Sequence, residues 1–179
     1  MKKELQEVKI EEIITEYAYT WLLLHKYDKD GLEVKKLTKP KQGFNYEEAK
    51  LAIEKLKYSL VKKKEASDFF GNEPGKKLDG IVNAIYQTFD KKELYPSIEE
   101  KAAHLLYFVI KDHPFIDGNK RIGSFLFIVF LTKNEYAYKK SGEKKINDNA
   151  LVALALLIAQ SDPRQKDIMV KLIINLLQN

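Results

Sequence analysis

The stretch that decides the fold is residues 113–132, which read HPFIDGNKRIGSFLFIVFLT. Its second half, from Ile122 to Thr132, is apolar on nearly every side of a helix. A helix that is hydrophobic all round is buried in the core of a protein. We therefore expect a central buried helix here, entered directly from the polar segment 113–121.

The helix before this stretch has well-marked ends. Ser97 with Glu100 three residues later forms a capping box at its start. Pro114 disfavours helical geometry at the residue before it, so the helix should end near Asp112. Its buried face is formed by apolar residues at helical spacing, namely Ile98, Ala102, Leu105, Leu106, Val109 and Ile110.

Further helices are expected on both sides of this pair. An amphipathic helix is predicted from Ile10 to Leu24, and a capping box of Asn45 and Glu48 opens another that reaches Leu60. The remaining helical segments begin near residue 81, run over 149–159, and start at Pro163 behind a cap at Ser161. Residues 136–146 fit a small hairpin. The class is all-α with at most one small β-hairpin.

Length and composition indicate one globular domain. The chain has 179 residues, of which 45% are hydrophobic and 32% are charged, and about 100–200 residues is the usual size of one domain. We expect a single domain over residues 1–179. It comprises N-terminal helices over 1–70, a core over 71–160 that contains the segment 113–121, and a C-terminal helix over 161–179.

Charge and cysteine content exclude several classes. The chain has no cysteine, which excludes disulfides, thiolate metal sites and a cysteine nucleophile and fits a cytoplasmic location. The net charge of +5 is mildly basic, but basic and acidic residues are interleaved, so nucleic acid is not an expected partner. The run 122–131, which has neither charge nor strong polarity, is about half as long as a membrane span. No signal peptide is visible at the start, and no membrane association is expected.

The segment 113–121 carries the residues that indicate chemistry. Gly118 lies directly before the predicted buried helix, where free backbone N–H groups and the helix dipole attract anions. Lys120 and Arg121 follow in the first turn, where cations oppose the dipole. Two cations in this place indicate a bound anion, and phosphate is the obvious candidate because Arg can bind it through two hydrogen bonds.

Asp117 and His113 add two further functions. A carboxylate beside a phosphate is favourable if Mg²⁺ lies between them, since Mg²⁺ takes one or two carboxylates plus phosphate oxygens. Histidine is the residue type whose unperturbed pKa, about 6.5, suits a general base at neutral pH, which makes His113 a candidate for that role. Together these residues predict phosphoryl or nucleotidyl transfer. The alternative is that Asp117 and His113 only cap helices and that Lys120 and Arg121 are solvated.

The segment 113–121 resembles the motif of the Fic/Doc family, His-x-Phe-x-(Asp/Glu)-(Gly/Ala)-Asn-(Gly/Lys)-Arg, at every fixed position. The flanking helices are also similar, so that the resemblance extends from about residue 71 to 159. It implies an all-α Fic/Doc-type domain. It also implies a transferase that uses ATP or another nucleoside triphosphate with Mg²⁺ to modify a Ser, Thr or Tyr hydroxyl of a target protein.

The resemblance also implies a role for each matching residue. His113 would be the general base and Phe115 would anchor the loop in the core. Asp117 would hold Mg²⁺ against the nucleotide phosphates. Gly118, Asn119 and Lys120 would bind phosphate, and Arg121 would bind phosphate and stabilise developing charge. Residues 88–94 would correspond to the flap that pairs with the backbone of the target protein.

Two positions separate branches of this family. Enzymes that transfer AMP typically have Gly at the place of Lys120 and a second Arg at the place of Ser124. The Lys is typical of the Doc branch, which resembles protein kinases and transfers the terminal phosphate. We therefore favour Doc-like phosphotransfer, with AMP transfer (AMPylation) as the alternative. A degenerate Fic fold that only binds a nucleotide or a partner is the alternative of another class.

Regulation and assembly stay open. The inhibitory pattern (Ser/Thr)-x-x-x-Glu-(Gly/Asn) of some Fic proteins is not found at either end, which leaves room for a separate antitoxin or regulatory partner. A homodimer is also open, because an all-α domain can bury an exposed stripe in one. The other two histidines, His25 and His104, are interpreted as structural.

Overall fold

The computed structural model describes residues 9–35 and 37–178. The chain divides into two compact units, residues 1–33 and 34–179. The prediction of one domain over residues 1–179, with its finer subdivision, stays a prediction. Within the described residues, no helix is long and apolar enough to cross a membrane.

The first unit contains two short helices where the sequence predicts one. Helix α1 spans Ile10–Glu16 and helix α2 spans Ala18–Asp28. They are separated at Tyr17, whose backbone has φ −102° and ψ 10°. The Tyr17 N–H still donates to the Ile13 carbonyl at 3.0 Å, and its own carbonyl accepts from Trp21 N–H at 3.1 Å. The prediction of a single helix is therefore wrong only at Tyr17, where the helix is interrupted; the segment is helical on both sides.

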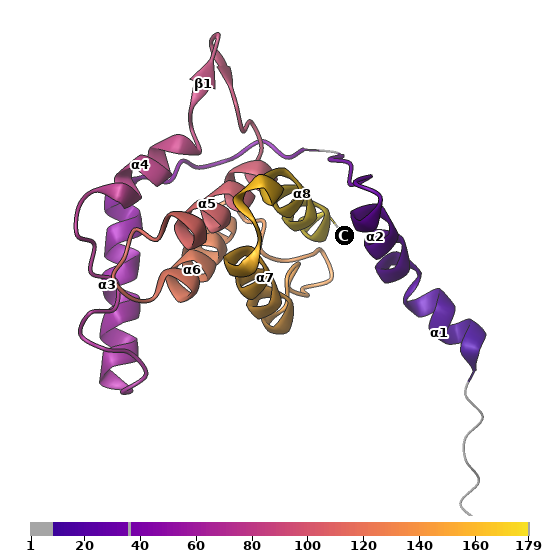
Figure 1. The fold of residues 1–179 in the computed structure, drawn as a ribbon, viewed down its shortest axis with the longest axis horizontal. Coiled ribbons are helices and arrows are strands. Elements are labelled where there is room, and N and C mark those ends of the chain that lie inside the picture. Colours follow the sequence, from indigo (N-terminus) through magenta and orange to yellow (C-terminus); the bar gives the residue numbers. More distant parts are fainter. Residues whose placement is uncertain (1–8, 36, 179) are drawn as a thin grey trace, which may run out of the picture. The chain divides into compact units, whose positions relative to one another are not determined.

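The second unit is helical, as predicted (Figure 1). Helices α5 and α6 lie beside α7 and α8 in this picture, and α3 and α4 form the other side of the unit. The helices are α3 (Tyr46–Lys62), α4 (Lys77–Ala84), α5 (Ile98–Asp112), α6 (Asn119–Lys133), α7 (Asp148–Gln160) and α8 (Lys166–Leu177), with a short 3₁₀ turn at Pro163–Gln165.

Helices α5 and α6 form the core. The helix after the motif, α6, is buried as expected, and its side chains Ile122, Leu126 and Phe130 are fully enclosed. Helix α5 packs against α4, α6, α7 and α8. Gly123 permits the close approach of α5 and α6, because a Cβ there would lie 3.0 Å from Ile110 Cγ1. Any larger residue would push the two helices apart.

The helix ends agree with most of the predictions. The capping boxes of Asn45 with Glu48 and of Ser97 with Glu100 are both present, and α5 ends at Asp112. The predicted cap before Pro163, Ser161, is wrong. The cap is Asp162, whose carboxylate accepts a hydrogen bond from Arg164 N–H. Helix α4 begins at Lys77, four residues before the apolar segment that predicts it. Its first turn has one buried apolar residue, Leu78, between polar neighbours, so the continuous apolar segment alone understates the length of the helix.

The β-structure lies at a different place from the predicted hairpin. Strands β1 (Thr88–Phe89) and β2 (Lys92–Glu93) pair as an antiparallel hairpin that projects from the unit (Figure 1). Asp90 and Lys91 form its turn with φ values of 47° and 61°, as a two-residue type I′ turn requires. Residues 136–146 hold only one isolated bridge, between Tyr138 and Lys144. The hairpin therefore lies where the resemblance implies a flap.

Candidate active site

The segment 113–118 connects α5 to α6 as a tight loop that is held from inside. Asn119 is buried, and its side-chain oxygen accepts from Phe115 N–H at 2.9 Å. Its amide NH₂ donates to the Phe115 carbonyl at 2.8 Å. Phe115 is itself buried, as the resemblance implies. The Asn119 side chain therefore holds the loop closed, and only its backbone N–H is free to meet a phosphate.

Gly118 is required by the packing around it. It has φ +93°, a left-handed conformation that favours glycine. A Cβ at this position would lie 2.4 Å from the ring of Phe70, which is fully buried. The glycine therefore allows the loop to lie directly on an aromatic ring that the sequence analysis did not identify.

His113 lies at the end of α5 and faces solvent. It also has a left-handed backbone, with φ 46°. Its ring Nδ1 lies 3.0 Å from the Lys111 carbonyl oxygen. A carbonyl only accepts, so Nδ1 carries the proton and the lone pair is on Nε2. That tautomer is the one that a general base with an outward Nε2 needs.

Asp117 and Arg121 are joined to each other and to residues 65–72, which we call the clamp segment. The two side chains form an ion pair at 3.5 Å. Ser67 Oγ donates to Asp117 Oδ2 at 3.1 Å, and Arg121 donates to the Glu65 carbonyl at 2.9 Å. The guanidinium carbon of Arg121 lies 4.5 Å from the centre of the Phe70 ring. The clamp segment thus positions both charged residues of the motif.

The backbone completes this attachment. Gly71 N–H donates to the Asp117 carbonyl at 3.0 Å, and Ile116 N–H donates to the Asn72 carbonyl at 2.9 Å. Within the clamp segment, Ser67 and Phe70 make these contacts through their side chains, and neither residue belongs to a sequence pattern that indicates function. Glu65 contributes its backbone carbonyl, which every residue type has, so the sequence gives no sign of this contact.

The first turn of α6 offers an anion-binding site. Within the described part of the chain, the N–H groups of Asn119, Lys120 and Arg121 donate to no protein acceptor, as the first turn of a helix requires. Lys120 is exposed and forms no ion pair among the described residues. These three N–H groups and the two cations are therefore available to a phosphate. His113 makes no hydrogen bond or ion pair with them in the described structure.

The donor set fits magnesium in one specific way. Outside the masked positions, no group of three or more His, Asp or Glu side chains could hold a metal ion. Asp117 is a single, half-exposed carboxylate, and the contacts above involve only its Oδ2. One carboxylate combined with substrate phosphates is the usual way in which proteins bind Mg²⁺. The residues therefore fit a magnesium ion that arrives with a nucleotide.

The flap is tied to α5 by a buried lysine. Lys101 is fully enclosed, and its ammonium group donates to the carbonyls of Ile85 at 3.1 Å and Tyr95 at 2.6 Å. It also pairs with Glu93 on β2 at 2.9 Å. These partners bracket the hairpin, so Lys101 positions its base. No sequence pattern marks Lys101 as functional, because a lysine in an amphipathic helix is normally exposed.

The other histidines differ from His113. His104 is buried in α5, where its Nδ1 donates to the Glu100 carbonyl at 2.8 Å and its ring stacks on Tyr95 at 3.6 Å. Burial lowers the pKa of His104 from 6.5 to about 4, so it is neutral at pH 7 and serves packing. His25 in α2 is exposed.

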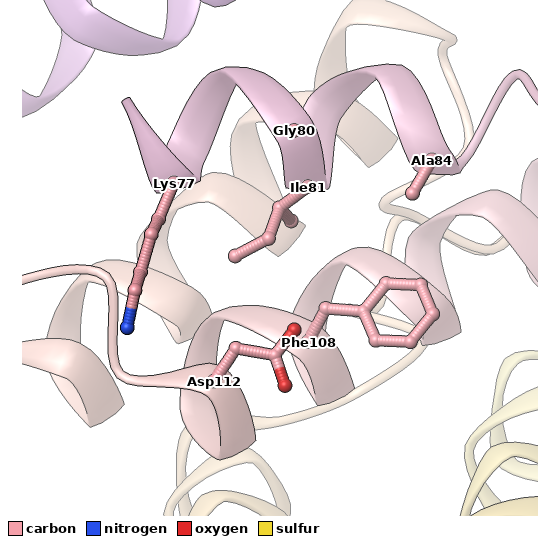
Figure 2. A pocket seen from close by; sticks show the side chains of 6 residues that line it. All are labelled: Lys77, Gly80, Ile81, Ala84, Phe108 and Asp112. Atoms are coloured by element: carbon pink, nitrogen blue, oxygen red, sulfur yellow. The ribbon is translucent and has the colours of Figure 1, made fainter. Parts of the chain in front are cut away.

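Cavities lie on several sides of the motif. One of about 600 Å³ is lined by Phe115 and by Gly71 and Asn72 of the clamp segment. Another, of about 360 Å³, lies between α4 and α5 (Figure 2), next in the chain to His113. A further cavity, of about 400 Å³, lies between α3, α6 and α7 beside Lys120, Arg121 and Ser124. Phe125 lines this last cavity, whereas Phe127 and Phe130 are buried in the core.

Comparison with known proteins identifies the family. The family model described as "Fic/DOC family" matches residues 44–131, from the end of the segment before α3 to the end of the apolar part of α6. Searches of the curated proteins and of the solved structures gave no match. The match includes the clamp segment, the flap, α5 and the complete motif. The chain therefore contains a Fic/DOC family domain at residues 44–131.

Proposed function

We propose that this protein is a transferase that moves a phosphate-containing group from ATP, or another nucleoside triphosphate, to a hydroxyl group of a target protein. The observation that carries the proposal is the free first turn of α6, where three backbone N–H groups and two cations follow Gly118. Family membership supports the same class of reaction.

Each motif residue then has a defined task. His113 accepts the proton of a Ser, Thr or Tyr hydroxyl at Nε2, and the hydroxyl oxygen attacks a phosphorus atom of the nucleotide. The bond from phosphorus to the leaving oxygen breaks, which releases ADP after attack at the γ-phosphate or pyrophosphate after attack at the α-phosphate. Arg121 and the N–H groups of α6 stabilise the charge that develops on the phosphoryl oxygens. A magnesium ion held by Asp117 would neutralise phosphate charge.

Lys120 favours transfer of the terminal phosphate over transfer of AMP. Its side chain is exposed at the first turn of α6, where it adds a charge and fills space that a glycine would leave to a phosphate group. Ser124 lies one turn later beside the cavity of α3, α6 and α7 and supplies no second cation. Protein adenylyltransferase activity is the alternative that the experiment must separate.

The experiment uses ATP labelled on either the α- or the γ-phosphate, incubated with the protein, a cell lysate and Mg²⁺ or a chelator. We expect γ-label on a protein band, only with Mg²⁺. Label from the α-phosphate would instead establish AMP transfer. No label from ATP, GTP, CTP or UTP would remove the enzymatic proposal and leave a nucleotide- or partner-binding module.

Two variants refine the result. Asp117→Asn keeps an oxygen acceptor for Ser67 but removes the charge, and we expect it to lose Mg²⁺-dependent labelling. Lys120→Ala keeps the helix and removes the ammonium group, and we expect it to raise the ratio of α-label to γ-label. An unchanged ratio would show that Lys120 does not select the phosphate that is transferred.

A further inference from the structure

The cavity between α4 and α5 is not used by the reaction described above. It has a volume of about 360 Å³, and its walls are Gly80, Ile81 and Ala84 from α4 and Phe108 from α5. Figure 2 shows Ile81, Ala84 and the Phe108 ring facing the same space, with Lys77 and Asp112 together at one end. The cavity therefore has an apolar interior and two charges of opposite sign at one end.

Its place in the chain connects it to both ends of a target-binding path. The Ala84 end of α4 leads within four residues to strand β1 of the flap. Asp112, at the opposite end of the cavity, directly precedes His113. The cavity thus lies between the flap and the predicted general base. A peptide that contacts both the flap and His113 would therefore have this cavity within reach of its side chains.

The two charges select against a charged ligand. In the described structure Lys77 and Asp112 form no ion pair and accept or donate no side-chain hydrogen bond. Burial raises the pKa of Asp112 above its ordinary value, although Lys77, Lys166 and His113 act in the opposite direction. A cationic ligand group would be attracted by Asp112 but repelled by Lys77. An anionic group would be attracted by Lys77 but repelled by Asp112. A neutral peptide unit can accept from Lys77 and donate to Asp112.

We propose that the α4–α5 cavity is a specificity pocket that binds a bulky apolar side chain, aliphatic or aromatic, of the target protein, a few residues from the modified hydroxyl. The inference rests on the proposed transferase function. Peptides that pair with a strand edge gain affinity through main-chain hydrogen bonds and specificity through pockets for single side chains. The flap supplies the strand edge here, and the cavity supplies the pocket.

Gly80 allows the pocket to be filled without disturbing the fold. A Cβ at this position meets no atom within 4 Å, and the residue is inside a helix. Gly80→Leu therefore places a side chain in the cavity and replaces a poor helix former by a good one. Asn83→Leu is the matched control, because it adds the same side chain to an exposed position of the same helix.

The probe is an array of synthetic peptides with one Ser, Thr or Tyr each. The positions around the hydroxyl carry Leu, Phe, Ala, Lys or Glu in turn. Label transfer from ATP is measured for wild type, Gly80→Leu and Asn83→Leu, together with nucleotide binding. We expect wild type to prefer Leu or Phe over Ala, Lys and Glu at least tenfold at one position. Gly80→Leu should lose that preference to within twofold through a higher KM, with nucleotide binding unchanged.

The outcomes separate the two proposals. If wild type labels peptides and Gly80→Leu keeps the same preference, the pocket inference is wrong and the transferase stands. A preference for Lys or Glu over Leu would overturn the apolar assignment. Loss of preference in Asn83→Leu as well would mean that α4 acts through stability and not through the cavity. If wild type labels neither peptides nor lysate proteins, both proposals fail together.

Discussion

The two ends of helix α5 are built in opposite ways. At its N-terminal end Ser97, Glu99 and Lys101 are buried, and each has its hydrogen bonds satisfied. At its C-terminal end Asp112 and His113 are exposed, and His113 makes one hydrogen bond, to the Lys111 carbonyl. One helix thus carries a buried polar network at one end and two exposed titratable groups with free lone pairs at the other.

Glu99 shows how complete the first network is. Its carboxylate accepts from the N–H and hydroxyl of Thr38 at 3.0 and 2.9 Å and from the Tyr136 hydroxyl at 2.6 Å. Burial, with the Glu99 hydrogen bond, raises the pKa of Tyr136 to about 12. Polar groups whose hydrogen bonds are all made within the protein stabilise the fold. Polar groups with unused donors or acceptors are able to bind a substrate.

The largest expected effect is on activity at the C-terminal end. His113→Ala should lower label transfer about 10²–10⁴-fold, because it removes the proposed general base. Its free energy of unfolding should fall by only about 1 kcal/mol, because the variant loses one solvent-exposed hydrogen bond to the Lys111 carbonyl. His25→Ala, at another exposed histidine, is the control and should change neither quantity. Transfer by His113→Ala at more than a tenth of the wild-type rate would contradict this assignment.

The reverse pattern is expected at the N-terminal end. Lys101→Met keeps the length of the side chain but leaves the carbonyls of Ile85 and Tyr95 without their donor. We expect the free energy of unfolding in denaturant to fall by about 3 kcal/mol, as when one partner of a buried network is removed. Hydrogen exchange over residues 86–95 should accelerate.

Lys92→Met on the exposed flap is the control for that change. It alters the charge of the hairpin without touching the buried network, and its stability should stay within about 0.5 kcal/mol of wild type. Equal losses in both variants would mean that the flap base does not depend on Lys101.

The middle of α5 gives a smaller effect that depends on pH. His104 has a pKa of about 4 in the folded chain and about 6.5 when unfolded. Between these values the unfolded chain binds more protons, so stability is complete above about pH 6.5 and falls as the pH drops toward 4. The loss should reach on the order of 2 kcal/mol near pH 4.5. His104→Gln should remove this part of the slope, as measured by denaturant unfolding at pH 7 and pH 4.5. If the free energy of unfolding changes equally with pH in both proteins, His104 is not a buried neutral histidine.

The smallest effect is expected in the clamp segment. Ser67→Ala removes a hydrogen bond to Asp117 that is open to solvent, so the free energy of unfolding should change by about 1 kcal/mol or less. Mg²⁺-dependent nucleotide binding, followed by calorimetry, should be retained. Ser59→Ala on the exposed face of α3 is the matched control. If Ser67→Ala loses nucleotide binding and Ser59→Ala keeps it, Ser67 contacts the ligand directly and does not only position Asp117.

The sequence predicted the helices well where their ends are marked by local chemistry. The capping boxes at Asn45 and Ser97 and the stop before Pro114 act within four residues, so they can be read without a structure. The same local reading failed at Ser161, because Asp162 offers a better acceptor one residue later. It also failed at Tyr17, where nothing in the composition marks the break between α1 and α2.

By itself, the sequence determined the all-α class and the motif at 113–121 and predicted the type of chemistry, because residue types at short spacing carry that information. Only the tertiary structure decided that Phe70 supports Gly118, that the Glu65 carbonyl holds Arg121 and that Lys101 fastens the flap. These contacts join residues far apart in the chain or use the backbone. A carbonyl group or a buried lysine leaves no pattern in the sequence, since its partner is chosen by packing alone.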